Sequence, residues 1–412
     1  MKKIIFDTDN TIGLEGRPMD DALALLYLLG LPAEAEVIGI TCNYGNGTVN
    51  EVYACTRKLL DEIGHPEMLV LRGSEQGEDA RSEASRWIAA TAAASPGEIS
   101  YLGIGSLGNL YGAYLIDNSV FDNLKEIVLM GGITEPLFIH GDQPLAELNM
   151  SINNIASECV LSKGHNISVI TGNNCLPVAE LPKNEFLAGL NTKTSPVGMF
   201  IAQKSGYRFR DKELIYGADS SYCWDAVAAA YLVHPALFKK HLLSCRITAD
   251  NLKTGFLNPC DEKDANAKIY IPSAIDKTTL QADFYKAWLA VDINKTETSF
   301  SCNGVYLDKL IQPAILIELS KEPAHGFLLL QRLKTAGTVD QNLDPAGFYR
   351  MLKKLEKADF LISKKTGSSP KAKQIFSITD LGRIALNNWY DTLTHYDNHI
   401  HHILNEIEQI NK

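Results

Sequence analysis

The chain opens with a repeated pattern in which a short apolar run is followed by a longer segment whose apolar residues share one face. The runs that predict buried strands are Lys3–Asp7, Glu36–Thr41, Met68–Leu71, Ile99–Ile104, Glu126–Met130 and Ile167–Thr171. Segments with helical spacing lie between them, at Asp20–Leu29, Asn50–Ile63 and Ser82–Ala94. Continuously apolar strands that alternate with helices are typical of a parallel sheet covered on both faces. The pattern therefore predicts an α/β domain built on a mostly parallel sheet.

Polar residues follow these apolar runs where each run ends. They are Asp7-Thr8-Asp9, Asn46, the Gly105–Asn109 turn, Thr134 and Asn173-Asn174. Ligands of open parallel sheets bind at the carboxyl ends of the strands. The sequence therefore predicts that one rim of the sheet collects these side chains.

The pattern changes around Asp292–Asn303, where polar residues prevail. Beyond it, three helical segments precede two short strands that flank a loop rich in Lys, Gly, Ser and Pro, and a long helix follows. Their ranges are Leu307–Leu319, Gly326–Leu333, Pro345–Ala358, Phe360–Lys364, Gln374–Thr379 and about Asp380–Glu408. This order predicts a winged helix-turn-helix. We therefore expect domains at residues 1–293 and 307–412, joined by a linker at 294–306.

Charge and cysteine content narrow the function classes. The 412 residues carry a net charge of −10, which argues against a general binder of polyanions. From Tyr306 onward, 14 Lys and Arg stand against 12 Asp and Glu, so the acidic excess lies in the first domain. No Cys-x-x-Cys pair occurs among the eight cysteines, which argues against a zinc or redox motif. Without a signal peptide or a membrane-length apolar run, we expect a cytoplasmic protein with no membrane partner.

Acidic and amide residues gather at the predicted rim and at two helix starts. The set consists of Asp7, Asp9, Asp20, Asp21, Glu147, Asn149 and Asp225. Clustered carboxylates raise each other's pKa unless a cation neutralises them, and hard oxygen ligands suit calcium or magnesium. The alternative is an ordinary helix N-terminus with solvated loop acids, because a helix dipole also favours negative charge there.

Several segments, in order, resemble the inosine/uridine-type nucleoside hydrolases. Asp7-Thr8-Asp9 with Asp20-Asp21-Ala22 is similar to a split form of that family's Asp-x-Asp-Pro-Gly-x-Asp-Asp signature. The further segments are Gly39-Ile40-Thr41 with Gly45-Asn46, Gly103–Leu110, Ile127–Ile133, Ala146-Glu147-Leu148-Asn149, Trp224-Asp225-Ala226 and Lys253-Thr254-Gly255. The resemblance covers roughly residues 1–293.

The resemblance implies a calcium site. Asp9 would bind Ca²⁺ and act as general base towards the attacking water. Asp21 and Asp225 would be further ligands, and the backbone carbonyl of Gly108 would complete the protein's contribution. Asp7 would support the loop from behind.

The resemblance also implies a nucleoside substrate. The residues that would hold its ribose hydroxyls are Asp20, Asn46, Glu147 and Asn149. N-glycosidic cleavage passes through an oxocarbenium-like sugar, as glycoside hydrolysis does, and nearby carboxylates stabilise that charge.

Two departures from the family pattern concern the base. Residues Asn10–Met19 separate Asp9 from Asp20 where the signature has three residues, and this loop either disturbs Asp9 or covers the base pocket. Trp224 stands where the common signature has a His that can protonate the leaving base. The purine-specific branch has a Trp there, so the resemblance implies a stacked purine. Trp87 could form the other side of an aromatic sandwich, or simply pack in the core.

The C-terminal segment resembles PadR-like transcriptional regulators over about residues 307–390. The resemblance rests on Ile315–Leu319, His325–Leu329, Asp344–Glu356 and Ile378–Arg383. It implies a recognition helix at Pro345–Lys357 and a wing at Lys364–Lys373. The lysines that would face duplex DNA phosphates are Lys364, Lys365, Lys371 and Lys373. The last helix would pair two subunits; the alternative is a module for dimerisation or protein binding only.

Three functions are compatible with these observations. The first is a calcium-dependent hydrolase of ribonucleosides, with a purine preference and a regulatory winged-helix tail. The second is a transcription factor that senses a nucleoside without turnover. The third is a hydrolase of a modified or nucleic-acid-attached nucleoside.

Overall fold

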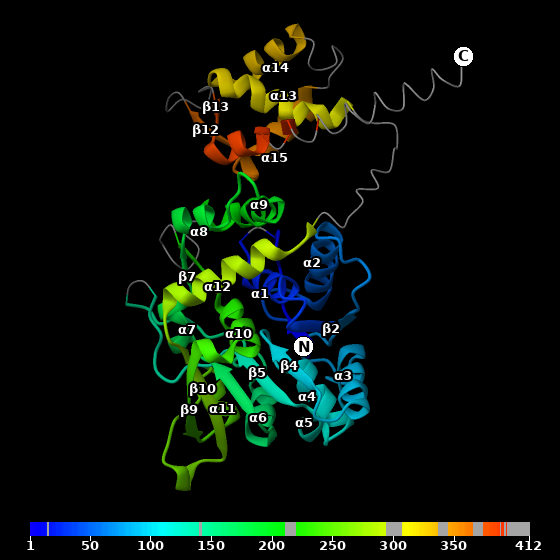
Figure 1. Ribbon diagram of the computed structural model, residues 1–412, viewed down its shortest axis with the longest axis vertical. Helices are drawn as coiled ribbons and strands as arrows, with labels where there is room; N and C mark the ends of the chain where they lie inside the picture. The colour runs from blue at the N-terminus through cyan, green and yellow to red at the C-terminus, as the bar shows by residue number, and fades with distance from the viewer. Residues whose placement is uncertain are drawn as a thin grey trace, which may run out of the picture. The chain divides into compact units, whose positions relative to one another are not determined.

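The computed structural model describes residues 1–14, 16–139, 142–210, 220–293, 307–336, 345–365, 374–387, 389–390 and 393. The chain divides into two compact units, Met1–Glu297 and Thr298–Lys412 (Figure 1). The domain limits expected at residues 293 and 307 bracket a segment outside the described residues, and they stay a prediction.

The first unit is built on an eight-stranded sheet with the order β3-β2-β1-β4-β5-β6-β10-β9. The strands are β1 (Lys2–Thr8), β2 (Ala35–Cys42), β3 (Val70–Arg72), β4 (Ile99–Gly103), β5 (Glu126–Met130), β6 (Ile167–Ile170), β9 (Phe238–Cys245) and β10 (Ala267–Ala274). Neighbours are parallel except β9 and β10. The prediction of a mostly parallel sheet is confirmed. The antiparallel edge pair was not predicted, because the exposed polar positions of β9 do not show the apolar run of a buried strand.

Helices cover the sheet in two groups that lie on opposite sides of the strands (Figure 1). One group contains α1 (Asp20–Leu29), α7 (Gly172–Ala179), α10 (Trp224–Val233) and α12 (Lys277–Ala290). The other contains α3 (Glu83–Ala94), α4 (Gly108–Ile116), α5 (Val120–Asn123), α6 (Asn154–Lys163) and α11 (Ala249–Leu252). The remaining elements are α2 (Val49–Glu62), α8 (Lys183–Gly189), α9 (Pro196–Arg210), the strand pair β7 (Glu180–Pro182) and β8 (Ser220–Tyr222), and the 3-10 turns Pro235–Leu237 and Glu262–Asp264.

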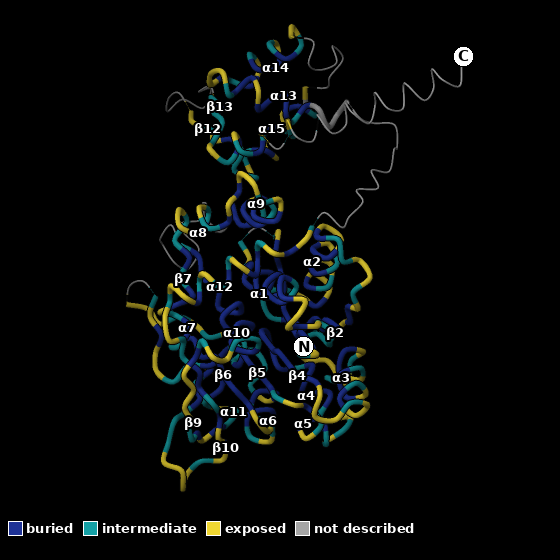
Figure 2. Tube along the Cα trace, viewed as in Figure 1, coloured by how far each residue is buried: buried dark blue, intermediate teal, exposed yellow. Residues whose placement is uncertain are grey.

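Helices α1 and α10 are buried along nearly their whole length (Figure 2). All residues from Asp20 to Leu28 and from Trp224 to Leu232 are buried. Helices that are apolar all round belong in an interior, and these two pack against each other. Their first turns, which carry acids, are thereby drawn into the interior at the strand ends.

The strand order places β1 at a topological switch point. The chain runs from β1 outward through β2 and β3, then returns to the other side of β1 as β4. Ligands of doubly wound sheets bind at such a reversal, beyond the carboxyl ends of the strands. Asp9 follows β1 directly and therefore stands at this point.

The second unit contains α13 (Leu307–Lys321), α14 (Gly326–Thr335) and α15 (Pro345–Lys357), followed by strands β12 (Leu361–Lys365) and β13 (Gln374–Ile378). A two-residue strand, β11 (Ala324–His325), completes a three-stranded sheet of order β11-β13-β12. Its core includes Ile315, Leu329, Phe348, Leu352 and Phe376. This is the predicted winged-helix arrangement. The predicted dimerisation helix lies mostly outside the described residues.

Among the residues that the structure describes, no helix has the length and apolar character needed to cross a bilayer.

Candidate active site

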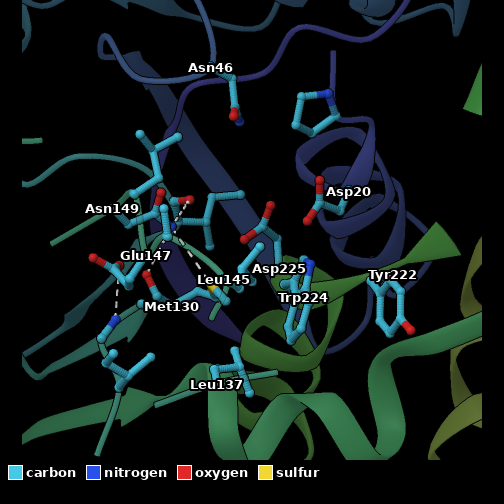
Figure 3. Close-up of a pocket in the computed structure, with 18 of the residues that line it drawn as sticks. Asp20, Asn46, Met130, Leu137, Leu145, Glu147, Asn149, Tyr222, Trp224 and Asp225 are labelled. Carbon is cyan, nitrogen blue, oxygen red and sulfur yellow. Dashed lines mark hydrogen bonds between the residues drawn. The ribbon is translucent and has the colours of Figure 1, made fainter. Parts of the chain in front are cut away.

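Four aspartates meet where β1, α1 and α10 converge. Asp9 follows β1, Asp20 and Asp21 open α1, and Asp225 lies in the first turn of α10. Each is at most 7% exposed. Carboxylate oxygens of Asp20, Asp21 and Asp225 lie within 4.8 Å of one another. Figure 3 shows the side chains of Asp20 and Asp225 directed into the same space.

Short hydrogen bonds fix Asp9 beside Asp21. The Thr8 hydroxyl and the Asp9 backbone N–H both donate to Asp21 Oδ1, at 2.5 and 3.1 Å. The Asn46 backbone N–H donates to Asp9 Oδ2 at 2.7 Å. A Cβ on Gly45 would stand 2.1 Å from Asp9 Oδ2, so only glycine lets that turn approach so closely. The segment after β2 therefore holds Asp9 in place.

Asp7 supports the cluster from inside the sheet. Its carboxylate accepts hydrogen bonds from the Thr41 hydroxyl at 2.6 Å, the Asn109 amide at 2.8 Å, and the Tyr101 hydroxyl. Burial raises the pKa of Asp7 to about 6, although these bonds oppose the shift. The arrangement agrees with the supporting role expected of Asp7.

The cluster carries more negative charge than its protein donors balance. Burial raises the pKa of Asp9 to about 7 and the pKa values of Asp21 and Asp225 well above the usual range, and neighbouring carboxylates add to each shift. Asp9 Oδ1 is buried without a hydrogen-bond partner. A hard divalent cation would satisfy this oxygen and remove the repulsion. These residues therefore fit the metal that the acidic pattern predicts, and Asp20 stands in the same cluster.

Glu147 and Asn149 form a second polar wall. Glu147 accepts backbone N–H bonds from Gly132 at 3.0 Å, from Met150 at 2.9 and 3.2 Å, and from Ser151 at 3.0 Å. The Asn149 amide donates to the carbonyl of Ile104 at 2.9 Å. Both residues are half-buried, and they line the same pocket as Asp20 and Asp225 (Figure 3).

The two walls enclose a cavity of about 200 Å³. Its described lining residues are Gly16, Pro18, Asp20, Asn46, Ile104, Met130, Gly131, Gly132, Ile133, Leu137, Leu145, Ala146, Glu147, Leu148, Asn149, Gly172, Tyr222, Trp224 and Asp225. They include no Lys, Arg or His. Gly16 and Pro18 come from the long loop between Asp9 and Asp20, so that loop contributes a wall of the pocket.

An aromatic pair forms another side of the cavity. The rings of Tyr222 and Trp224 are stacked, with centroids 5.2 Å apart and an angle of 16° between their planes. The sequence did not single out Tyr222, since it lies in a three-residue strand with no periodicity. Its position two residues before Trp224 was the available signal.

Four residues expected at this site, Asp9, Asp21, Trp87 and Gly108, are not among the described residues that line the cavity. Asp9 and Asp21 are hydrogen-bonded to each other in the buried carboxylate cluster. The ring of Trp87 packs over Gly39, where a Cβ would come within 2.4 Å of it, and the side chain contacts the core on that side of the sheet. Gly108 opens α4, and a Cβ there would stand 3.6 Å from the Asn153 amide nitrogen and 3.8 Å from the Tyr44 ring. The expected role of its backbone carbonyl as a ligand stays a prediction. The structure thus favours the core-packing alternative for Trp87.

The basic residues of the second unit are only partly described. Lys364 and Lys365 end β12 and are exposed. Lys371 and Lys373 lie outside the described residues. Helix α15 presents Arg350, Lys353 and Lys354 to solvent.

The doubly wound sheet, with a carboxylate cluster at its switch point beside a cavity of about 200 Å³, is an arrangement that suits a glycosidase that uses a metal ion. The sequence model of the inosine-uridine preferring nucleoside hydrolases matches residues 4–282. The chain belongs to this family, and it is an enzyme that hydrolyses the N-glycosidic bond of nucleosides. The model of the transcriptional regulator PadR-like family matches residues 315–388, so the same chain carries a PadR-like domain.

Relatives and solved structures agree with this assignment. The probable uridine nucleosidase 2 of Oryza sativa subsp. japonica is 28% identical over 268 residues, 58% of this chain and 75% of that protein. The pyrimidine-specific ribonucleoside hydrolase RihB of Escherichia coli (strain SE11) is 23% identical, over 66% of this chain and 92% of that protein. The purine-preferring ribonucleoside hydrolase of Gardnerella vaginalis shares the fold, with a TM-score of 0.60, 20% identity, and 71% and 100% of the two chains covered.

Proposed function

We propose that the first unit is a calcium-dependent ribonucleoside hydrolase that prefers purines. The observation that carries the proposal is the cavity itself, because it joins an under-neutralised carboxylate cluster, a polar wall and a stacked aromatic pair within about 200 Å³. The third possibility from the sequence, a modified or nucleic-acid-attached nucleoside, differs in the base or in the groups attached to the sugar.

The chain's own residues divide the work. Asp9, Asp21 and Asp225 hold the cation, which when bound supplies Lewis acidity that makes a water easier to deprotonate. Asp9 accepts the proton of the attacking water as general base.

The remaining polar residues bind the sugar. Asp20, Asn46, Glu147 and Asn149 receive the ribose hydroxyls, and the carboxylates favour the positive charge that develops on the ring. The backbone carbonyl of Gly108 remains an expected further ligand of the cation, whereas Trp87 has no part in this proposal.

The leaving base is recognised by stacking. The described lining of the cavity offers no His, Lys or Arg to protonate it, whereas Trp224, backed by Tyr222, presents a flat aromatic face. Stacking on such a face contributes about 1–3 kcal/mol per base, and more for the larger purine ring. Names among the relatives point both ways, since two are uridine or pyrimidine enzymes and one structure is purine-preferring.

The test is reducing-sugar release from inosine, guanosine, uridine and cytidine, in calcium and after chelation. We expect calcium-dependent turnover, faster on the purines, and Trp224→Ala should lose about tenfold more on purines than on pyrimidines. Trp87→Ala is the matched control and should lose the same on both classes. Faster cleavage of uridine, or equal losses in Trp224→Ala, would contradict the purine preference.

A second activity is proposed for the PadR-like unit, which we infer binds duplex DNA as a dimer. The supporting observation is the basic surface of α15 with Lys364 and Lys365 on the adjacent strand. Its test is fluorescence anisotropy of the full chain on duplex DNA across salt concentrations, because phosphate contacts give a steep salt dependence. Lys353→Ala/Lys354→Ala should weaken binding, as should Lys371→Ala/Lys373→Ala. If the full chain does not bind duplex DNA even at low salt, the PadR-like unit serves only in dimerisation or protein binding.

The same assay separates an enzyme from a nucleoside sensor. If Asp9→Ala, which blocks turnover, binds DNA with an affinity that inosine changes, the two sites are coupled. A wild type with no turnover but with this coupling would support the sensor alternative.

A further inference from the structure

A polar cluster lies at the far ends of the helices that carry the aspartates. His234 follows α10 directly, and its Nδ1 lies 2.9 Å from Asp283 Oδ2 on α12. The Tyr27 hydroxyl of α1 donates to the same Asp283 oxygen at 2.5 Å, and it also lies 2.9 Å from His234 Nδ1. The other ring nitrogen, Nε2, lies 2.7 Å from Glu34 Oε2. One imidazole therefore joins α1, α10 and α12.

The cluster is remote from the cavity but mechanically connected to it. Helix α10 runs from Asp225 to this imidazole, a distance of roughly 14 Å at 1.5 Å per residue. Helix α1 runs from Asp21 to Tyr27 in the same way. Both helices are buried along nearly their whole length, so a displacement at one end moves the other.

Helix α12 is the fixed support of the cluster. The Trp288 indole donates to the Leu23 carbonyl of α1 at 2.9 Å, and the ring is fully buried. Gly30, at the end of α1, touches the α12 backbone so closely that a Cβ would meet the Ala287 carbonyl at 1.9 Å. Asp283 therefore belongs to a helix already anchored on α1, and His234 is the polar side chain that extends this anchor to α10.

The charge state suits this arrangement. An imidazole with acceptors on both nitrogens can donate to both only as imidazolium. Burial lowers the pKa of His234, but its hydrogen bonds to Asp283 and Glu34 outweigh that effect, and the pKa is raised overall. The groups that face the ring are the carboxyl groups of Asp283 and Glu34 and the hydroxyl group of Tyr27.

We propose that His234 is a positioning residue, which ties the ends of α1, α10 and α12 so that Asp21 and Asp225 keep the spacing that a divalent cation needs. The inference rests on the proposed cation site. It assigns His234 no contact with substrate, and it predicts that breaking the tie weakens cation binding before it weakens the fold.

The test titrates calcium into wild type, His234→Gln and Asp283→Asn, following the melting temperature without substrate. Because His234 makes no bond to a proposed ligand of the cation, we expect a smaller effect than the roughly 10- to 100-fold change given by direct partners of metal ligands. The calcium dissociation constant, fitted from the melting temperatures at several calcium concentrations, should rise about threefold in both variants. The matched control is His165→Gln, since His165 lies 3.3 Å from Asp122 in a fully surface pair. His165→Gln should have the same calcium dissociation constant as wild type.

A pH series adds a readout that packing alone would not give. A histidine with a raised pKa stabilises the fold below its unfolded pKa, and this contribution is lost as pH rises through the folded pKa. The difference in melting temperature between wild type and His234→Gln should therefore be larger at about pH 6 than at about pH 8.5.

The outcomes are distinct. If wild type shows no calcium shift, the proposed cation site fails, and this inference fails with it. If wild type shows the shift and His234→Gln melts lower with the same calcium dissociation constant, the site stands and the positioning role is overturned. An unchanged difference in melting temperature between the two pH values would overturn the ionic tie.

Discussion

Two sets of carboxylates face each other across the cavity, and their surroundings are opposite. Glu147 accepts backbone hydrogen bonds from Gly132, Met150 and Ser151. Asp9 accepts one backbone bond, from Asn46, and leaves Oδ1 without a partner. The protein therefore surrounds Glu147 with donors from its own backbone, whereas the aspartate cluster keeps a buried carboxylate oxygen that a bound cation would satisfy.

This difference separates two ways of holding negative charge near a reacting sugar. Glu147 rests in a fixed cradle of main-chain donors, and Gly255 leaves room for it, since a Cβ there would stand 2.2 Å from Glu147 Oε2. The aspartates are held close together against their mutual repulsion. Cation removal should therefore affect one wall and leave the other unchanged.

Asp21→Asn should have the largest effect, because it removes one charge from the cluster at nearly constant shape. We expect loss of the calcium-induced rise in melting temperature and a fall in kcat on the order of a thousandfold. Calorimetric calcium titration and single-turnover assays measure both. Asp250→Asn, which changes an exposed acid paired with Lys253, is the control and should behave as wild type. If calcium raises the melting temperature of Asp21→Asn as much as that of wild type, the aspartate cluster does not depend on a cation, and the proposed difference between the two walls is wrong.

The pH dependence of the metal-free protein should be the next largest effect. The pKa of Asp9 is raised to about 7 by burial, so the folded state binds more protons than the unfolded state between about pH 4 and 7. Stability should therefore fall as pH rises through that window, and calcium should cancel the loss. We expect the gap in melting temperature with and without calcium to widen by roughly 5–10 °C from pH 5 to 7.5. If the difference in melting temperature with and without calcium becomes smaller as pH rises, the predicted direction of the pH dependence is wrong.

Glu147→Gln should lower stability by about 3 kcal/mol, because an amide nitrogen replaces one acceptor among backbone donors. The loss should be equal with and without calcium, and KM should rise. Chemical denaturation in both conditions measures this. Glu67→Gln, at an exposed position, controls for loss of charge. A changed calcium dissociation constant in Glu147→Gln would mean that the walls are not independent.

Gly45→Ala should have the smallest effect on stability, about 1–2 kcal/mol, since only the tip of Asp9 must shift. Gly45→Ala should weaken calcium binding more strongly than it lowers the stability of the fold, because the displaced side chain, Asp9, is an expected ligand of the cation. Gly97→Ala is the comparison, because an alanine there would carry the strain of a φ of +75° but meet no neighbouring atom within 4 Å, whereas Gly45→Ala brings a clash. Equal calcium dissociation constants in the two variants would show that Asp9 tolerates displacement.

Local pattern was sufficient for much of the fold. The predicted ranges Asp20–Leu29 and Glu126–Met130 coincide with α1 and β5, because the spacing of apolar residues and the length of each apolar run can be read directly from the sequence. The β9–β10 pair was not predicted, since its stability comes from partners distant in sequence. The two-residue strand β11 is too short to show the alternation of apolar and polar residues that predicts a strand.

The site divides in the same way. Strand order alone brings Asp9 and the first turn of α1 to one rim, so their proximity was predictable. The stacking of Tyr222 on Trp224 and the packing of Trp87 over Gly39 depend on side-chain directions that spacing does not encode. The closeness of the Asp20 carboxylate to those of Asp21 and Asp225 also depends on side-chain directions that spacing does not encode.

The buried Trp288 links the end of the first unit to its beginning, and this has a consequence for synthesis on the ribosome. Helix α1 is made early, but the surface on which α12 rests stays uncovered until almost the whole unit has been translated. Domains made in order usually fold in order. Here the first unit closes only with its last helix, so a nascent chain stalled before Trp288 would expose the flank of α1 to chaperones and proteases.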